Sequence, residues 1–381
     1  PYYLAITLTP LEVRWYGLAW LPLILLYIGL GKFVFHRKPL PPLGQGALAQ
    51  WFAHPAVPFY ILAYALSVSM ISLSYIDPLS LTLAFAAGAI LYMGSAFLFR
   101  TPGWIYASLF AAHMTLLASF TINPKGGEAY MLSYPFHALT WLMALSGLGF
   151  SLRMARPASV EKEAYRFTFL ERLFGHAWAR PFFVFALLDI FVWQVIALNG
   201  YETTLTLAIG HALLLTLFAI LWTEGALVYG VVAFGLLAAG ASLKQAEVGF
   251  ADAVAVFGGI GFGLYLVGSL LERLASRVRA LTVWPRPLAH SAIFLTAVAV
   301  VINLMQVRAE MTAAAAALGF AGALYVTIAY RGRLHLLGYL GLALLEIAWT
   351  LALVMNDVAQ PQFYAVPGGL YFLGVAYLEL Q

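Results

Sequence analysis

The sequence predicts an all-α integral membrane protein, a polytopic helical bundle of about 13 transmembrane helices with one leading helix and three parallel four-helix repeats. Three observations predict this fold class. Of the 381 residues, 63% are hydrophobic and 9% are charged, whereas soluble domains have roughly 45–50% apolar and about 25% charged residues. The apolar residues form runs of about 20, the length that a helix needs to cross a bilayer core. Most basic residues lie in alternate connections between these runs.

The composition also excludes several classes of protein. The 20 basic and 16 acidic residues cannot cover the surface of a soluble domain of this length. The aromatic content of 15% and the mean hydropathy of +0.89 are the reverse of a disordered composition. The chain has no cysteine, which excludes disulfides, thiolate metal sites and a cysteine nucleophile. No nucleic-acid partner is expected, because the basic residues lie in short connections and form no soluble patch.

Thirteen apolar runs, separated by charged residues, proline or glycine, are the predicted spans. They do not alternate between apolar and polar residues as the strands of a membrane barrel do. A backbone in lipid must satisfy its hydrogen bonds within its own segment, so each run is expected to be a helix. The predicted spans are 16–36, 56–76, 79–99, 104–122, 132–152, 181–199, 203–222, 226–243, 251–271, 287–306, 311–330, 334–354 and 363–380.

The basic residues divide unequally between the two sides of the membrane. On the side where the first span ends, the connections contain 16 of the 20 lysines and arginines. Cytoplasmic loops are enriched in these residues, which places this side in the cytoplasm, the N-terminus outside and the C-terminus in the cytoplasm. The predicted location is therefore the cytoplasmic (inner) membrane. The basic set is Lys32, Arg37, Lys38, Arg100, Arg153, Arg156, Lys162, Arg166, Arg172, Arg180, Arg273, Arg277, Arg279, Arg286, Arg331 and Arg333.

One connection, 157–180, is longer and both charged and aromatic. Its apolar residues, Phe169, Leu170, Leu173, Phe174, Ala177 and Trp178, have helical spacing, and basic residues are available for the opposite face. This pattern predicts an amphipathic helix on the cytoplasmic leaflet. The alternative is a linker that packs on the bundle.

Short similarities indicate an internal repeat. Leu81–Ala84 recurs as Leu205–Ala208 at the start of a span, and Val256–Gly259 resembles Val366–Gly369. A unit with an even number of spans gives parallel repeats, whereas many secondary transporters use inverted ones. Chance similarity between helices rich in leucine and alanine is the alternative. The predicted division is 1–54 for the leading helix and cytoplasmic linker, 55–156 for repeat 1, 157–180 for the interfacial helix, 181–286 for repeat 2, and 287–381 for repeat 3, with truncation of repeat 3 left open.

Two acidic residues lie clearly within predicted spans, namely Asp189 and Glu346. An ionisable group inside a span is costly and is a functional-site hypothesis by default. A proton or cation relay would place such carboxylates opposite one another or opposite a base. The alternative is that each is protonated or hydrogen-bonded to a neighbouring helix.

Three histidines lie within predicted spans, and His113 and His137 are on two spans joined by a short outer loop. Axial ligation of a haem or chlorin needs imidazole nitrogens, so this pair is the candidate cofactor site. Counted from that loop, the two residues differ in depth by about 6 Å at 1.5 Å per residue. The alternative is that each is an ordinary hydrogen-bonding residue. The sequence predicts no catalytic residue and no metal site.

The glycine-rich stretch Gly258–Gly263 lies inside the predicted span 251–271. It lacks the Lys-Ser/Thr of a phosphate-binding loop. Small residues at this spacing let membrane helices approach closely, so a packing role is expected.

These observations favour a non-catalytic polytopic membrane protein, either a structural or assembly subunit of a membrane complex or a lipid-binding scaffold. The expected partners are membrane lipids and other membrane protein subunits. One alternative is a transporter or channel for a small or hydrophobic solute that uses Asp189 or Glu346. Another is a redox subunit that binds haem or a pigment through His113 and His137.

Overall fold

The computed structural model describes residues 12–35, 54–122, 132–154, 177–306 and 310–379. All secondary structure in these ranges is helical, and no strand occurs in them. Eleven of the described helices are long and apolar enough to cross a membrane. The all-α prediction is confirmed, and the eleven apolar helices indicate a multi-pass protein embedded in a membrane.

The chain forms two compact units, residues 1–196 and 197–381. The helices of the first are η1 (Val13–Trp15), η2 (Leu18–Trp20), α2 (Leu21–Gly29), η3 (Leu30–Phe35), α4 (Val57–Ser74), α5 (Pro78–Phe99), α6 (Gly103–Ile122), α7 (Ser133–Met154) and α9 (Arg180–Ala197), whose last residue falls in the second unit.

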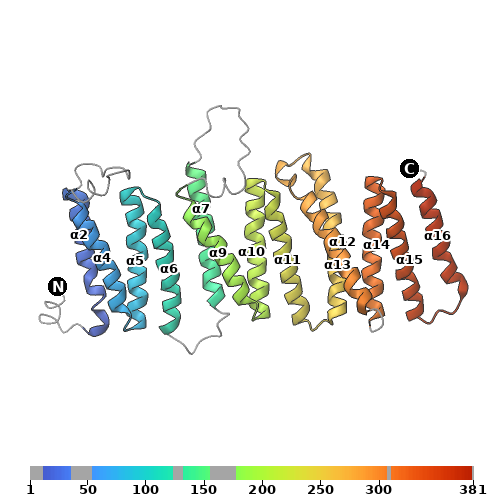
Figure 1. Cartoon of the computed structure of the whole chain (residues 1–381), viewed down its shortest axis with the longest axis horizontal. Helices are drawn as coiled ribbons and strands as arrows, with labels where there is room; N and C mark the ends of the chain where they lie inside the picture. Colours follow the sequence, from blue (N-terminus) through green and yellow to red (C-terminus); the bar gives the residue numbers. More distant parts are fainter. Residues whose placement is uncertain (1–11, 36–53, 123–131, 155–176, 307–309, 380–381) are drawn as a thin grey trace. The chain divides into compact units, whose positions relative to one another are not determined.

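The helices of the second unit follow one another up and down, so that sequence neighbours are antiparallel (Figure 1). They are α10 (Tyr201–Trp222), α11 (Gly225–Gln245), α12 (Phe250–Ala275), η6 (Arg279–Leu281), α13 (Pro285–Gln306), α14 (Met311–Gly332), α15 (His335–Met355) and α16 (Pro361–Glu379). The most extensive helix packing in this unit is between α14 and α15, between α12 and α13, and between α10 and α11, all pairs of consecutive α-helices.

A helix occupies each of the thirteen predicted runs, and the first run is covered jointly by η2, α2 and η3. The candidate membrane-spanning helices do not include α7 or α16. Polar Ser133, Tyr134 and His137 stand in the first turns of α7, and α16 contains Pro367. The count of thirteen spans therefore stays a prediction.

Three helices, α5, α10 and α14, have the same length and the same kind of end. Each has 22 residues. The residue after each one, Arg100, Thr223 and Arg333 respectively, has a left-handed backbone with φ of 55°, 51° and 52°. This conformation ends a helix and turns the chain within a few residues. It lets α6, α11 and α15 return directly alongside the helix that precedes each of them.

Glycines bring helices of the second unit into close contact. A Cβ atom at Gly322 of α14 would lie 2.8 Å from the carbonyl oxygen of Gly341, and a Cβ at Gly341 of α15 would lie 2.7 Å from the backbone nitrogen of Val326. In α12, Gly258 faces Ala299 and Gly261 faces the carbonyl oxygen of Ala292, both on α13. The packing role expected for the glycine-rich stretch is thus found at these two positions.

Large apolar side chains are exposed in the middle of helices. Ile90 of α5 is 75% exposed, Phe191 of α9 is 77% exposed and Phe294 of α13 is 68% exposed. Burying such a side chain away from water is worth about 1.5–3 kcal/mol. Contact of these side chains with the hydrocarbon of a bilayer is more favourable than contact with water. Their exposure therefore agrees with a membrane-embedded bundle.

Most of the predicted interfacial helix, 157–180, lies outside the described residues. Trp178, near its end, is described, and its ring stacks on Phe97 with a centroid separation of 5.5 Å. It also stacks on Phe150 at 6.1 Å. The end of this connection therefore packs on α5 and α7 through an aromatic side chain.

Candidate functional site

The candidate site of the first unit lies in the middle of three helices. His113 is ten residues after Gly103, the first residue of α6, and Asp189 is nine residues after Arg180, the first residue of α9. At 1.5 Å per residue, both side chains start about 15 Å from the ends of their helices. Thr140 of α7 completes the group.

Asp189 has polar partners on both neighbouring helices. Nε2 of His113 lies 3.0 Å from each carboxyl oxygen of Asp189. The hydroxyl group of Thr140 lies 3.2 Å from Oδ2 of Asp189 and 2.8 Å from the carbonyl oxygen of Phe136, to either of which it can donate. These contacts connect α6, α7 and α9 through one carboxyl group.

The hydrogen-bond partners of His113 and Asp189 indicate how many titratable protons the two side chains hold together. Nδ1 of His113 lies 2.7 Å from the carbonyl oxygen of Leu109, and a carbonyl oxygen only accepts, so Nδ1 carries a hydrogen. Nε2 faces the carboxyl group at hydrogen-bond distance, and two lone pairs would repel there, so a second proton lies between them. It belongs either to Nε2, giving imidazolium and carboxylate, or to Asp189, giving two neutral groups. The net charge is zero in both cases.

Aromatic side chains enclose the pair. The ring of Phe136 lies 5.7 Å from that of His113 and stacks on Trp193 at 3.8 Å. The ring of Phe185 lies 5.1 Å from that of His113. Asp189 is 5% exposed. A net charge in such surroundings is unfavourable, so the neutrality of the pair suits its location.

His137 hydrogen-bonds within its own helix. The indole N–H of Trp141 donates to Nε2 of His137 at 3.1 Å. The sequence pairs His113 with His137, whereas the structure gives His113 the acid Asp189 as its partner. Binding of haem iron through Nε2 of either histidine would require one of these hydrogen bonds to break. The haem or chlorin site stays a prediction, and an absorption spectrum of the purified protein tests it.

The sequence prediction pairs the two histidines with each other and leaves out the acids, so it does not include the contact between His113 and Asp189. A signal was available in the sequence. On the predicted topology, the spans 104–122 and 181–199 both start on the cytoplasmic side. Counting residues from that side places His113 and Asp189 at nearly the same depth.

Glu346, in the second unit, has different surroundings. It is half-buried in the middle of α15, and no hydrogen bond or ion pair to its carboxyl group is found in the part of the chain that the structure describes. A Cβ at Gly368 of α16 would lie 3.4 Å from Oε1 of Glu346. Glycine at this position leaves room for the carboxyl group between α15 and α16.

A proline lies beside Glu346 in the neighbouring helix. Pro367 has no N–H, so the carbonyl oxygen of Phe363, four residues earlier, loses its helical partner. The indole N–H of Trp349 donates to this oxygen at 3.2 Å. Trp349 of α15 therefore supplies the hydrogen bond that the carbonyl oxygen of Phe363 in α16 loses because of Pro367.

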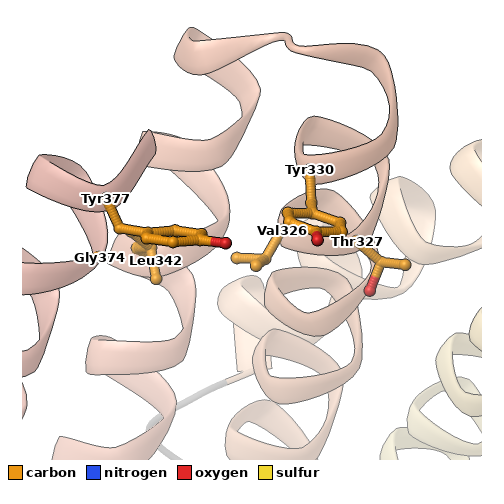
Figure 2. Close-up of a pocket in the computed structure, with 6 residues that line it drawn as sticks. All are labelled: Val326, Thr327, Tyr330, Leu342, Gly374 and Tyr377. Atoms are coloured by element: carbon orange, nitrogen blue, oxygen red, sulfur yellow. The ribbon is translucent and has the colours of Figure 1, made fainter. Parts of the chain in front are cut away.

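An apolar cavity of about 270 Å³ lies between α14, α15 and α16. Figure 2 shows Tyr330 and Tyr377 on either side of it, with Val326 between them and Leu342 below the ring of Tyr377. Tyr330 directly precedes Arg331 near the end of α14. Tyr377 likewise lies near the end of α16, so the cavity lies near the C-terminal ends of these two helices.

No group of three or more histidine or acidic side chains that could hold a metal ion is found among the described residues.

In comparisons with known proteins, no family model, no curated protein and no solved structure matches the chain.

Proposed function

We propose that this chain is a non-catalytic polytopic membrane protein that acts as a scaffold, packing against other membrane protein subunits or binding lipid. The hydrogen-bonded pair of His113 and Asp189 is the observation that carries the proposal. A proton relay would also place an acid opposite a base, but the charge of that acid would have to change beside water or a cation. Asp189 is instead buried, neutral together with its partner and bonded to two neighbouring helices.

The pair is suited to joining helices. Hydrogen bonds between membrane helices contribute on average about 0.6 kcal/mol and at most about 1.7 kcal/mol. The stacked pair of Phe136 and Trp193 lies about one helical turn from Thr140 and Asp189 on the same two helices. Polar contacts therefore join α6, α7 and α9, and aromatic packing joins α7 and α9 one turn away.

Helix boundaries support the proposal of three parallel four-helix repeats after one leading helix. Helix α14 begins 110 residues after α10 begins, at Met311 and Tyr201, and it ends 110 residues after α10 ends, at Gly332 and Trp222. The ends of α11 and α15 have the same offset, from Gly225 to His335 and from Gln245 to Met355. The three left-handed residues that follow α5, α10 and α14 also have equivalent places in the proposed unit.

The proposed orientation has the N-terminus outside, the C-terminus in the cytoplasm and the protein in the cytoplasmic membrane. Arg273, Arg277, Arg286, Arg331 and Arg333 all lie near the C-terminal ends of α12 and α14 or the start of α13. Only Lys244 is basic among the residues described near the opposite ends of these helices. This asymmetry supports the positive-inside assignment.

Exposed apolar surface supports lipid and membrane proteins as partners. Side chains such as Ile90, Phe191 and Phe294 point away from the rest of their unit, and the cavity in Figure 2 is lined almost entirely by apolar and aromatic groups. An acyl chain or an apolar helix of another subunit suits such surfaces.

The proposal is tested by changing Asp189→Asn and Glu346→Gln separately in the full chain. An amide can replace much of the hydrogen bonding of a protonated acid. We therefore expect both variants to keep their expression, thermal stability and association with partner subunits. Asp189→Leu is the matched control, because it removes the hydrogen bonds to α6 and α7 and should lower stability. Loss of ion- or proton-coupled uptake into vesicles by either amide variant, with normal stability, would contradict the scaffold.

A transporter or channel is the second candidate function, and Glu346 is the residue that favours it. Its half-buried carboxyl group faces Gly368, next to the helix interruption at Pro367. Interrupted helices and intramembrane acids occur together at the ion and substrate sites of transporters. In this case Glu346→Gln should abolish uptake while Asp189→Asn leaves it unchanged.

A further inference from the structure

A second cavity, of about 330 Å³, lies where three helices of the second unit meet near their basic ends. Ser269 and Glu272 line it from α12, Arg286 from α13 and Arg331 from α14. It is distinct from the apolar cavity of Figure 2, which lies on another side of α14 and involves α15 and α16. Its lining contains two guanidinium groups and one carboxylate, so positive charge is in excess.

Arg331 is held in place by α12. Its guanidinium donates to Oε2 of Glu272 at 2.8 Å and also to the hydroxyl group of Ser269. Two of its five N–H groups are used in this way, and the others remain available. The contact neutralises Glu272 and fixes one arginine at the edge of the cavity.

Arg286 supplies the uncompensated charge. It is exposed, lines the same cavity, and forms no hydrogen bond or ion pair with the part of the chain that the structure describes. Pro285 and Pro287 flank it at the start of α13 and lack N–H groups, so the backbone there offers few donors to a ligand. An anion in this cavity would therefore be bound mainly by arginine side chains.

We propose that this cavity binds the phosphate group of an anionic membrane lipid. Guanidinium groups bind phosphate oxygens through paired hydrogen bonds. The cavity lies between membrane helices at the end where the basic residues gather, and basic pockets of this kind hold anionic headgroups in the cytoplasmic leaflet. This inference deepens the proposed function, because it rests on the lipid-binding part of the scaffold and names the chemistry of the lipid.

The test uses the full chain in lipid nanodiscs that contain equal amounts of phosphatidylglycerol and phosphatidylcholine. Native mass spectrometry measures the ratio of the two lipids that stay bound to the protein. We expect the unmodified chain to enrich phosphatidylglycerol. Arg286→Gln should lower this enrichment about fivefold, the effect of one basic residue near a membrane surface. Arg331→Gln should lower it at least as much, because it also leaves Glu272 without its partner.

Two further variants sharpen the test. Glu272→Gln removes the negative charge but keeps an oxygen that accepts from Arg331, so it should raise the enrichment. Arg277→Gln is the matched control, because Arg277 is exposed near the same ends of the helices but does not line this cavity; the enrichment should stay unchanged. Equal thermal stability of all variants in pure phosphatidylcholine excludes a folding defect.

Two outcomes would overturn the inference. In the first, Arg286→Gln and Glu272→Gln both behave like Arg277→Gln. In the second, millimolar glycerol phosphate stabilises the chain in an Arg286-dependent way while phosphatidylglycerol is not enriched, which would assign the cavity to a soluble phosphate compound. Neither outcome depends on uptake or on the Asp189 and Glu346 variants, so failure here is distinguishable from failure of the scaffold proposal.

Discussion

A single buried acid illustrates how this protein accommodates a polar group at the residue scale. Asp189 lies in an apolar, aromatic environment, yet His113 and Thr140 supply it with hydrogen bonds from two other helices. Leaving one of these groups buried without its partner costs about 1–3 kcal/mol. The effect of removing one partner on the free energy of unfolding should therefore depend on whether the other is present.

The interdependence can be measured with His113→Leu, Asp189→Leu and the double variant. His113→Leu should lower the free energy of unfolding, because it leaves Asp189 with the hydroxyl group of Thr140 as its side-chain partner. The double variant should be less destabilised than the sum of the single variants, with a coupling of about 0.6–1.7 kcal/mol. Thermal or denaturant unfolding in a fixed detergent gives the three values. Strict additivity would show that the contact contributes nothing.

At this scale the candidate residues can be identified from the sequence, whereas the contacts that they make cannot. The position of Asp189 and His113 inside spans follows from hydropathy, and both residues proved to be in one site. Which helix packs against which does not follow from hydropathy, because apolar faces of leucine- and alanine-rich helices are alike. The role of Trp349 in satisfying the carbonyl oxygen of Phe363 could not be predicted for the same reason.

At the scale of helices, close packing depends on the absence of side-chain atoms. Gly322 and Gly341 bring α14 and α15 so near that a Cβ on either would approach backbone atoms to less than 3 Å. Backbone atoms inside a helix cannot move away as a flexible side chain can. This pair of helices should therefore be unusually sensitive to small increases in volume.

Gly341→Ala should destabilise the protein by about 1–3 kcal/mol, the usual effect of overpacking a close-packed site. Alanine favours a helix over glycine by about 1 kcal/mol, so the steric effect has to exceed this gain. Gly263→Ala in α12 is the control, because no atom lies within 4 Å of its added Cβ, and it should be neutral or stabilising. A melting temperature of Gly341→Ala equal to that of Gly263→Ala would contradict the close approach.

Helix existence was predictable, and helix ends were predictable in part. The run 203–222 agrees with α10 within two residues, since the polar Thr223-Glu224-Gly225 turn marks its end. The sequence predicts α7 and α16 as spans like the others, whereas neither is among the candidate membrane-spanning helices. His137 lies within α7 and Pro367 within α16.

At the scale of the whole molecule, membrane sidedness is the property that the charge pattern predicts. The chain has no cysteine, so single cysteines at Lys244 and Arg277 can be labelled selectively. Lys244 lies in the last turn of α11, before the start of α12, and Arg277 lies just after the end of α12. The 26 residues of α12 give it a length of about 39 Å. A membrane-impermeant maleimide should label Lys244→Cys from outside and Arg277→Cys from the cytoplasm. Labelling of both from one side would contradict the proposed topology.

The buried pair of the first unit also has a consequence for biosynthesis. His113 precedes Asp189 by 76 residues, so at about 5–20 residues per second the ribosome makes it roughly 4–15 seconds earlier. Insertion of the helices in the order of their synthesis would place α6, with His113, in the bilayer before α9 brings Asp189 there. Because His113 precedes Asp189 along the chain, the nascent protein would not hold Asp189 in lipid for long without its partner.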